Sequence, residues 1–397
     1  MKSTELARMI VGQICLHACM AGTRMAAPLL ALRDGHSALN VGVLLALFAL
    51  APVFLALPAG RFADRHGMHK PVGMSVAVAA IGAGLALVFP VFPVLCLSAF
   101  LTGGATGAAS IALQRHVGRA AVGPTELRRV FSWLAIGPAV SNFIGPLAAG
   151  LMIDYAGPNA GDTTGYRAAF LLMMLLPITT WFWIRPVSDL PPITSVAGAA
   201  PTRAWDLMRE PMMRRLMLVN WCMSSCWDVH MFAVPLLGHE RGFNASVIGA
   251  ILGAFAIAAA LIRGAIPLVA AHLQEFVVVT SAMVVSALVF AVYPFMYGAL
   301  AMGTCSVLLG LALGTVQPMV MSMLHQITPE ARHGEALGLR LMAINASSVA
   351  MPLVFGTLGA VVGVSALFWA VGGFVVLGSR QAMRLRGDER HGHGASG

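Results

Sequence analysis

PLLALRDGHSALNVGVLLALFALA, residues 28–51, returns about 207 positions later as PLLGHERGFNASVIGAILGAFAIA, residues 235–258. The two stretches are identical at ten of 24 aligned positions. A second pair, SNFIGPLAAG (141–150) and SSVAMPLVFG (347–356), repeats at nearly the same offset. Two similar halves that are rich in long apolar segments predict a protein that exposes one central site to alternate faces of a membrane.

The composition is that of an integral membrane protein. The chain is 58% hydrophobic and only 10% charged, whereas a soluble domain is about a quarter charged. A membrane-spanning helix needs ~20 mostly apolar residues, and charge gaps with Gly/Pro punctuation divide the chain into twelve such stretches. These are residues 8–31, 41–63, 72–91, 93–117, 129–152, 167–186, 213–237, 246–269, 274–294, 297–324, 335–360 and 363–384. We therefore expect an all-α fold of twelve transmembrane helices in two pseudo-symmetric six-helix bundles.

One long polar segment separates the halves. Its prolines and small residues predict a cytoplasmic linker with one short interfacial helix around Thr202–Arg209. The expected organisation is an N-terminal bundle (1–186), the linker (187–212), a C-terminal bundle (213–384) and a disordered basic tail (385–397).

The basic residues predict the orientation. Of 25 Lys and Arg, 19 lie in the N-terminus, the inner loops and the C-terminal tail. The positive-inside rule then places both termini and the linker in the cytoplasm. No cleavable signal peptide is evident, because the first stretch is too long and too polar. The positive charge is scattered over short loops, which argues against nucleic-acid binding. We expect a bacterial-type inner (plasma) membrane protein.

GRFADRHGMHK, residues 60–70, resembles the signature loop between spans two and three of the major facilitator superfamily (MFS). With the twelve spans and the two halves, the resemblance covers essentially the whole chain, in the style of bacterial drug and metabolite exporters. It implies that this loop latches the two halves on the cytoplasmic side. The implied gating residues are Gly60, Asp64, Arg65, Gly67 and Lys70.

The same resemblance predicts specific contacts for Asp64. They are Arg115 or Arg119 at the end of span four, and the N-terminal end of span eleven, whose positive dipole attracts a carboxylate. One departure from the family pattern is Met68, where a basic residue is usual.

Span five resembles the glycine-proline signature of the superfamily's antiporters. Gly145, Pro146 and Gly150 carry the resemblance, which implies a hinge and packing seam and favours export. Ordinary tight packing is the alternative. The span-four arginine of proton-coupled drug exporters is missing, since residues 91–113 contain no charge.

Few ionisable residues lie deep in the spans, and charges in hydrocarbon cost roughly 2.5–3.5 kcal/mol each, so they indicate function. Asp228 is the one deep acid and Arg24 the one comparably deep arginine, with His17 and His230 beside them in sequence. We expect Arg24 and Asp228 to form a charged couple in the central cavity, which a proton at Asp228 or His230 would loosen. The alternative is a permanent ion pair.

Neutral polar residues extend the candidate substrate-binding and proton-coupling set, although each also suits an interhelical hydrogen bond. They are Gln13, Asn220, Asn142, Gln317 and Asn345.

The sequence therefore predicts a proton-coupled secondary transporter of a small organic solute, working as an exporter and as a monomer in lipid. It predicts no enzyme activity, no catalytic residue, no cofactor, no bound metal and no nucleic-acid partner. Two alternatives stay open. Cys15 and Cys19 align with Cys222 and Cys226, which suits a soft-metal, copper-type transporter of the same superfamily. The other alternative is a sensor or scaffold that uses the same fold.

Overall fold

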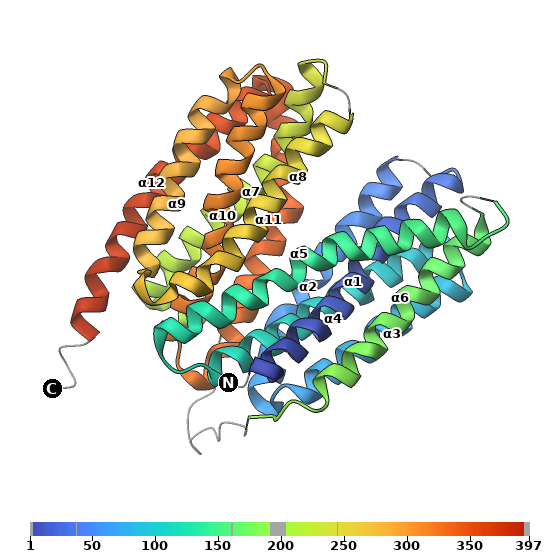
Figure 1. Cartoon of the computed structure of the whole chain (residues 1–397), viewed down its shortest axis with the longest axis horizontal. Coiled ribbons are helices and arrows are strands. Elements are labelled where there is room, and N and C mark those ends of the chain that lie inside the picture. Colours follow the sequence, from blue (N-terminus) through green and yellow to red (C-terminus); the bar gives the residue numbers. More distant parts are fainter. Residues whose placement is uncertain (1–2, 37, 160–161, 191–203, 244, 393–397) are drawn as a thin grey trace. The chain divides into compact units, whose positions relative to one another are not determined.

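The computed structural model describes residues 3–36, 38–159, 162–190, 204–243 and 245–392. Within these ranges, side chains are described except at 38–39, 239, 245–246, 249, 351–362 and 381–392. The described residues form twelve long α-helices and no strand. The helices are α1 (Ser3–Arg33), α2 (Ala38–His66), α3 (His69–Val88), α4 (Phe92–Ala120), α5 (Gly123–Tyr155), α6 (Thr163–Ile184), α7 (Pro211–Glu240), α8 (Ala245–Val269), α9 (Glu275–Val292), α10 (Ala299–Ile327), α11 (His333–Val362) and α12 (Val364–Gly392) (Figure 1).

Each of the twelve apolar stretches predicted from the sequence coincides with one of these helices. Nine helices of the described chain are long and apolar enough to cross a membrane, and α12 contains a shorter apolar segment, Val364–Arg380. Helix α7 is not among the nine, and it carries Asn220, Asp228 and His230. The all-helical membrane fold expected from the sequence is confirmed.

The internal repeat is visible in how the first helix of each half ends. Gly35 and Gly242, which are equivalent in the repeat, both adopt positive φ, 85° and 75°. In each turn, the backbone N–H of the residue after the glycine donates to the carbonyl five residues earlier in the chain. His36 donates to Ala31, and Phe243 donates to Gly238. This is the left-handed glycine ending of a helix, which residues with a Cβ rarely adopt.

The same repeat places one close helix–helix approach at equivalent positions in the two halves. A Cβ at Gly103 on α4 would lie under 3.0 Å from the backbone of Phe48 on α2. A Cβ at Gly310 on α10 would meet the backbone of Phe255 on α8 in the same way. Phe48 and Phe255 are equivalent in the repeat, so in both bundles a glycine at the equivalent position lets two helix backbones come close together.

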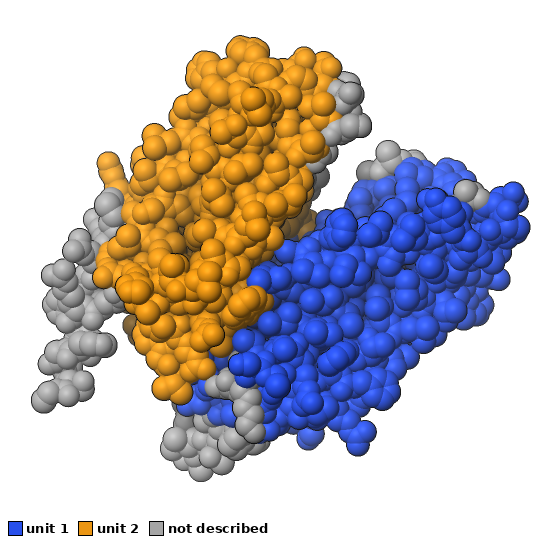
Figure 2. Space-filling view, in the orientation of Figure 1, with its two compact units in different colours: residues 1–121, 134–200, 329–346 blue, residues 122–133, 201–328, 347–397 orange. Residues whose placement is uncertain are grey.

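The chain forms two compact units, coloured separately in Figure 2. Unit 1 contains 1–121, 134–200 and 329–346, and unit 2 contains 122–133, 201–328 and 347–397. In unit 1, α1 packs on α6, α2 on α4, and α3 on both α4 and α6. In unit 2, α7 packs on α12, α8 on α10, and α9 on both α10 and α12. The two packing patterns are equivalent.

The units differ from the sequence halves at two helix ends. The first residues of α5 (122–133) belong to unit 2, and the first residues of α11 (329–346) belong to unit 1. The physical reason lies in polar contacts made by Arg128 and by the backbone of Gly334, described below.

Four short 3-10 helices complete the fold. They are η1 (Ala204–Arg209), η2 (Ala270–His272), η3 (Tyr293–Phe295) and η4 (Glu330–Arg332). The first corresponds to the short helix predicted around Thr202–Arg209, while 191–203 of the predicted linker lie outside the described residues. Helix α12 continues to Gly392, so helix occupies most of the tail predicted as disordered, of which 393–397 are not described.

Candidate functional site

Asp64 organises a buried polar cluster at the end of α2. Its Oδ1 accepts from Nε of Arg115 at 2.6 Å and from the backbone N–H of Gly334 at 2.8 Å. Its Oδ2 accepts from the backbone N–H of Glu335 at 3.1 Å. Both contacts expected from the signature loop, Arg115 and the N-terminal end of α11, are therefore present. The helix terminus and the guanidinium together compensate the desolvation of the carboxylate.

Two glycines allow this approach. A Cβ at Gly60 would lie under 3.0 Å from the Gly334 backbone, and a Cβ at Gly334 would lie equally close to Gly60 and Asp64. The α2 and α11 backbones therefore touch where the carboxylate meets the helix end. Glu335 closes the cluster by accepting from Arg61 and Arg332, each at 2.7 Å.

The rest of the signature loop contacts a second carboxylate, that of Asp189. Gly67 has φ of 75°, and a Cβ there would lie 2.7 Å from Asp189. Asp189, which follows α6, accepts from the backbone N–H groups of Met68 (3.1 Å) and His69 (3.2 Å). It therefore caps the N-terminus of α3. Sequence reasoning missed this role, because 120 residues separate His69 from its partner.

The two basic residues predicted as gating residues behave differently from Asp64. Arg65 and Lys70 are both exposed. Arg119, the other candidate partner of Asp64, binds Glu330 at 2.8 Å instead. Their roles in gating stay a prediction.

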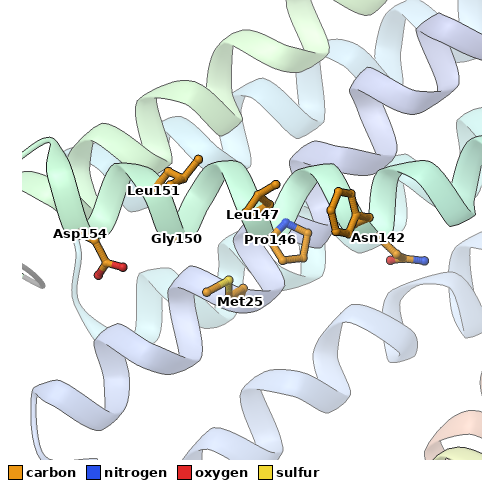
Figure 3. Close-up of a pocket in the computed structure, with 8 residues that line it drawn as sticks. Met25, Asn142, Pro146, Leu147, Gly150, Leu151 and Asp154 are labelled. Atoms are coloured by element: carbon orange, nitrogen blue, oxygen red, sulfur yellow. The ribbon is translucent and has the colours of Figure 1, made fainter. Parts of the chain in front are cut away.

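The glycine-proline segment of α5 packs on α1. A Cβ at Gly145 would lie 2.5 Å from the Ala18 carbonyl oxygen, and the Ser141 hydroxyl donates to the Ile14 carbonyl at 3.2 Å. Beside this seam, Pro146 and Gly150 line a hollow of about 420 Å³ (Figure 3). The hollow is lined by Met25, Asn142, Phe143, Pro146, Leu147, Gly150, Leu151 and Asp154.

Three of the predicted polar residues gather at this face of unit 1. His17 lies beside the Asn142 side chain, and Arg24 lies close enough to His17 to act on it electrostatically. Arg24 itself is exposed on α1. The hollow therefore combines an apolar wall with an amide, a carboxylate (Asp154) and a nearby guanidinium.

Asp228 belongs to unit 2. Its carboxyl group lies beside the hydroxyl groups of Ser347 and Ser348 on α11, yet its Oδ2 atom has no hydrogen-bond partner among the described residues. Because Arg24 and Asp228 lie in different units, their pairing stays a prediction.

His230 is fully buried in unit 2. Its Nε2 lies 2.9 Å from the Ser306 hydroxyl, and its ring stacks on Phe255 at 4.1 Å. The predicted proton-binding residue therefore sits in a polar contact between α7 and α10 rather than at an exposed face of its unit.

The neutral polar candidates are distributed over both units. Gln13 is buried against Gly137 of α5, and Asn220 is buried on α7. Gln317 is half-buried. Asn345 donates to the Leu341 carbonyl of its own helix at 2.8 Å. Their place in a substrate site stays a prediction.

A buried ion pair in unit 2 was not foreseen. Arg128 at the start of α5 binds Glu275 at 2.9 Å, and Glu275 also accepts from Ser322 and Gln326, each at 2.9 Å. Arg128 is equivalent to Gly334 when Ser141 is laid over Ser347. The internal repeat could have predicted this contact, because the start of α5 belongs to unit 2 in the same way that the start of α11 belongs to unit 1.

Among the described residues, no group of three or more His, Cys, Asp or Glu side chains is placed to hold a metal ion.

The sequence matches the family model of the Major Facilitator Superfamily over residues 9–305 and 216–397. No match was found among curated protein sequences.

Solved structures share the fold at low identity. The human organic anion transporter MFSD10 (TETRAN) is 15% identical, with a TM-score of 0.78 over 96% of this chain and 100% of the other. A bacterial homologue of the iron transporter ferroportin, in an outward-facing state, is 15% identical, with a TM-score of 0.80 over 96% and 99%. FucP, an MFS transporter in the outward conformation, is 12% identical, with a TM-score of 0.77 over 97% and 99%.

Proposed function

Because the chain belongs to the Major Facilitator Superfamily, we propose that this integral membrane protein is a proton-coupled secondary transporter that exports a small organic solute by alternating access. No enzymatic step is part of this proposal. The distribution of Lys and Arg supports a cytoplasmic location for both termini, and a bacterial-type inner membrane is the proposed location.

The observation that carries the proposal is the carboxyl group of Asp228. It lies in the interior of α7, beside two serine hydroxyls but with Oδ2 unpartnered in the described structure. A carboxylate in that position is costly, and its cost falls when it binds a proton or a cation. A carboxyl group that is ionised in one conformation and protonated in another can couple proton movement to the conformational change.

The hollow on unit 1 supports a small amphipathic solute. Its volume of about 420 Å³ lies in the range of small-molecule sites. Most of its lining is apolar, while Asn142 and Asp154 supply polar contacts. Arg24, exposed on the neighbouring α1, would attract an anionic group, and loosening an Arg24–Asp228 couple would free it to do so.

Export is supported by the glycine-proline seam. Gly145 brings α5 onto the α1 backbone, and Pro146 lies in the middle of α5. A proline inside a membrane helix removes one backbone hydrogen bond and permits bending. This seam would let α5 change its bend as the solute site changes sides.

The test is transport by right-side-out and inside-out vesicles, with and without an imposed pH gradient. The solute panel includes carboxyfluorescein as an anionic probe and ethidium as a cationic probe. Flux that requires the gradient and disappears in Asp228→Asn supports the proposal. Gradient-independent flux that is unchanged in Asp228→Asn would make the protein a facilitator and Asp228 a structural residue.

A matched control uses the last residue of the same helix. Glu240→Gln removes one negative charge from an exposed position on α7 and should leave transport intact. The double variant Arg24→Ala/Asp228→Ala separates coupling from scaffolding: full transport in the double variant would mean that the two residues only hold the protein together.

A further inference from the structure

Unit 2 contains a chain of three buried polar side chains that the transport proposal does not use. His230 of α7, Ser306 of α10 and Tyr293 of η3 each have no exposed surface. Nε2 of His230 lies 2.9 Å from the Ser306 Oγ, and that Oγ lies 2.8 Å from the Tyr293 hydroxyl. Both distances are those of ordinary hydrogen bonds.

Aromatic rings hold both ends of the chain in place. The imidazole of His230 stacks on Phe255 with 4.1 Å between centroids and 22° between planes. The Tyr293 ring stacks on Phe368 at 4.8 Å and 7°. The two ends therefore have little freedom to rotate away from Ser306.

The direction of the hydrogen bonds follows from the last contact. The Tyr293 hydroxyl donates to the Met302 carbonyl at 3.3 Å, and it has only one hydrogen to give. Either hydroxyl can donate in the Ser306–Tyr293 contact, but when the Tyr293 hydrogen is on Met302 the Ser306 hydroxyl donates to Tyr293 and accepts from His230. Nε2 therefore carries the hydrogen, and Nδ1 of the neutral ring is left with its lone pair.

Nδ1 has no hydrogen-bond partner among the described residues. A buried nitrogen left unsatisfied is rare in folded proteins and calls for an explanation. The unpaired Nδ1 could be either an acceptor or an N–H donor. Buried N–H groups without a partner are rarer in proteins than under-satisfied acceptors. The Nε2–H tautomer is favoured on this ground as well.

We propose that Ser306 and Tyr293 are positioning residues that hold His230 in the Nε2–H tautomer and thereby make Nδ1 a second proton-binding atom, in addition to the Asp228 carboxylate. This inference rests on the proton-coupled transport proposed above. The proton comes from water, one N–H bond forms at Nδ1, and the hydrogen bonds to Ser306 and Tyr293 stay as they are. Release breaks that same bond and returns the proton to water.

The ionisable groups around this chain come from several elements. Asp228 lies two residues from His230 on α7, and Arg263 of α8 lies over the Trp227 ring at 5.8 Å. Arg241 and Cys305 act electrostatically on Tyr293.

The experiment observes the ring directly. The full chain is labelled with [15N]histidine, placed in lipid bilayers and studied by solid-state NMR, and His230 is assigned from the signal that His230→Gln removes. The expected spectrum at high pH shows hydrogen on Nε2 and a lone pair on Nδ1, and acidification adds hydrogen at Nδ1. A neutral ring with hydrogen on Nδ1 would overturn the proposal.

Variants separate positioning from packing. Tyr293→Phe keeps the ring on Phe368 but frees the Ser306 hydroxyl to donate to Nε2, so the Nδ1–H tautomer should become populated. Ser306→Thr keeps a hydroxyl and should preserve the wild-type tautomer. An unchanged tautomer in Tyr293→Phe would show that the hydroxyl chain does not position the ring.

Proton uptake completes the test. In His230→Gln the new side chain can still donate to Ser306 but has no basic nitrogen. On acidification from pH 8 to pH 5 this variant should therefore take up about one proton fewer per chain than the wild type. Equal uptake in both proteins would overturn the proposal. Flux that ignores the pH gradient would instead overturn coupled transport, while the NMR tautomer would still report on Ser306 and Tyr293.

Discussion

Arg128 and Glu275 form a buried ion pair that joins the second turn of α5 to the first residue of α9 within unit 2. Nε of the same guanidinium donates to the Ala270 carbonyl at 2.9 Å. The pair is the counterpart of the contact between Asp64 and the start of α11 in unit 1. Each unit therefore contains the N-terminal end of a helix whose remaining length belongs to the other unit.

Breaking this pair should destabilise the protein. Glu275→Gln leaves the guanidinium of Arg128 buried without a compensating charge, and loss of one partner of a buried pair costs about 3–5 kcal/mol. Chemical denaturation in mixed micelles, followed by tryptophan fluorescence, measures the loss. The double variant Arg128→Met/Glu275→Gln should recover part of it. Additive losses in the double variant would contradict a direct coupling between the two charges.

Asp64→Asn should loosen the start of α11. The amide nitrogen of Asn would face the backbone N–H groups of Gly334 or Glu335, which need acceptors, and charge-assisted hydrogen bonds are worth about 1.5–3 kcal/mol. Hydrogen exchange at these two amides should accelerate by about tenfold or more, since 1.4 kcal/mol is a factor of ten. Asp34→Asn, an exposed acid paired with its neighbour Arg33, serves as control and should leave both amides unchanged.

Gly310→Ala should destabilise unit 2, because the new Cβ would be forced against the Phe255 backbone, which cannot move like a flexible side chain. Overpacking of this kind costs about 1–3 kcal/mol. Gly303→Ala on the same helix is the matched control, since nothing lies within 4 Å of its Cβ position. Equal denaturation midpoints for the two variants would show that α8 and α10 are not in backbone contact.

Asp189 should hold the start of α3 over a wide pH range. Partial burial acts to raise the pKa of Asp189, but the nearby His116 imidazole, hydrogen bonds from the backbone N–H groups of Met68 and His69, and the charge of His69 lower it well below the ordinary value. A lowered pKa means that the carboxylate stabilises the fold above its unfolded pKa of about 3.9 and loses that effect only in stronger acid.

Amide exchange tests this expectation. Protection of the Met68 and His69 amides, corrected for intrinsic rates, should not fall in the wild type between pH 8 and pH 5. Asp189→Asn should exchange about fivefold faster at both pH values, as expected for a lost cap worth about 1 kcal/mol. A wild-type protection that collapses near pH 5 would show that the carboxylate titrates there and is not held ionised.

The helices and their repeat follow directly from the sequence. Apolar runs of spanning length must be helical in lipid, because every backbone hydrogen bond has to be satisfied within the segment. Gly35 and Gly242 end equivalent helices with positive φ, and both were already aligned in the repeated stretch. The partner of Asp64 at the start of α11 was predicted because the resemblance of residues 60–70 to the superfamily's signature loop implies that contact.

Tertiary structure decided which charges meet. Glu275 was indistinguishable in sequence from a solvated acid at a helix start, and only the packing of α5 and α10 brings Arg128, Ser322 and Gln326 to it. His230 lies two residues from Asp228, yet its partners come from α10 and η3. Local sequence determines which segments become helices, because that choice depends on backbone and lipid. Contacts between distant side chains depend on the rotation and depth of each helix, which only the packed bundle fixes.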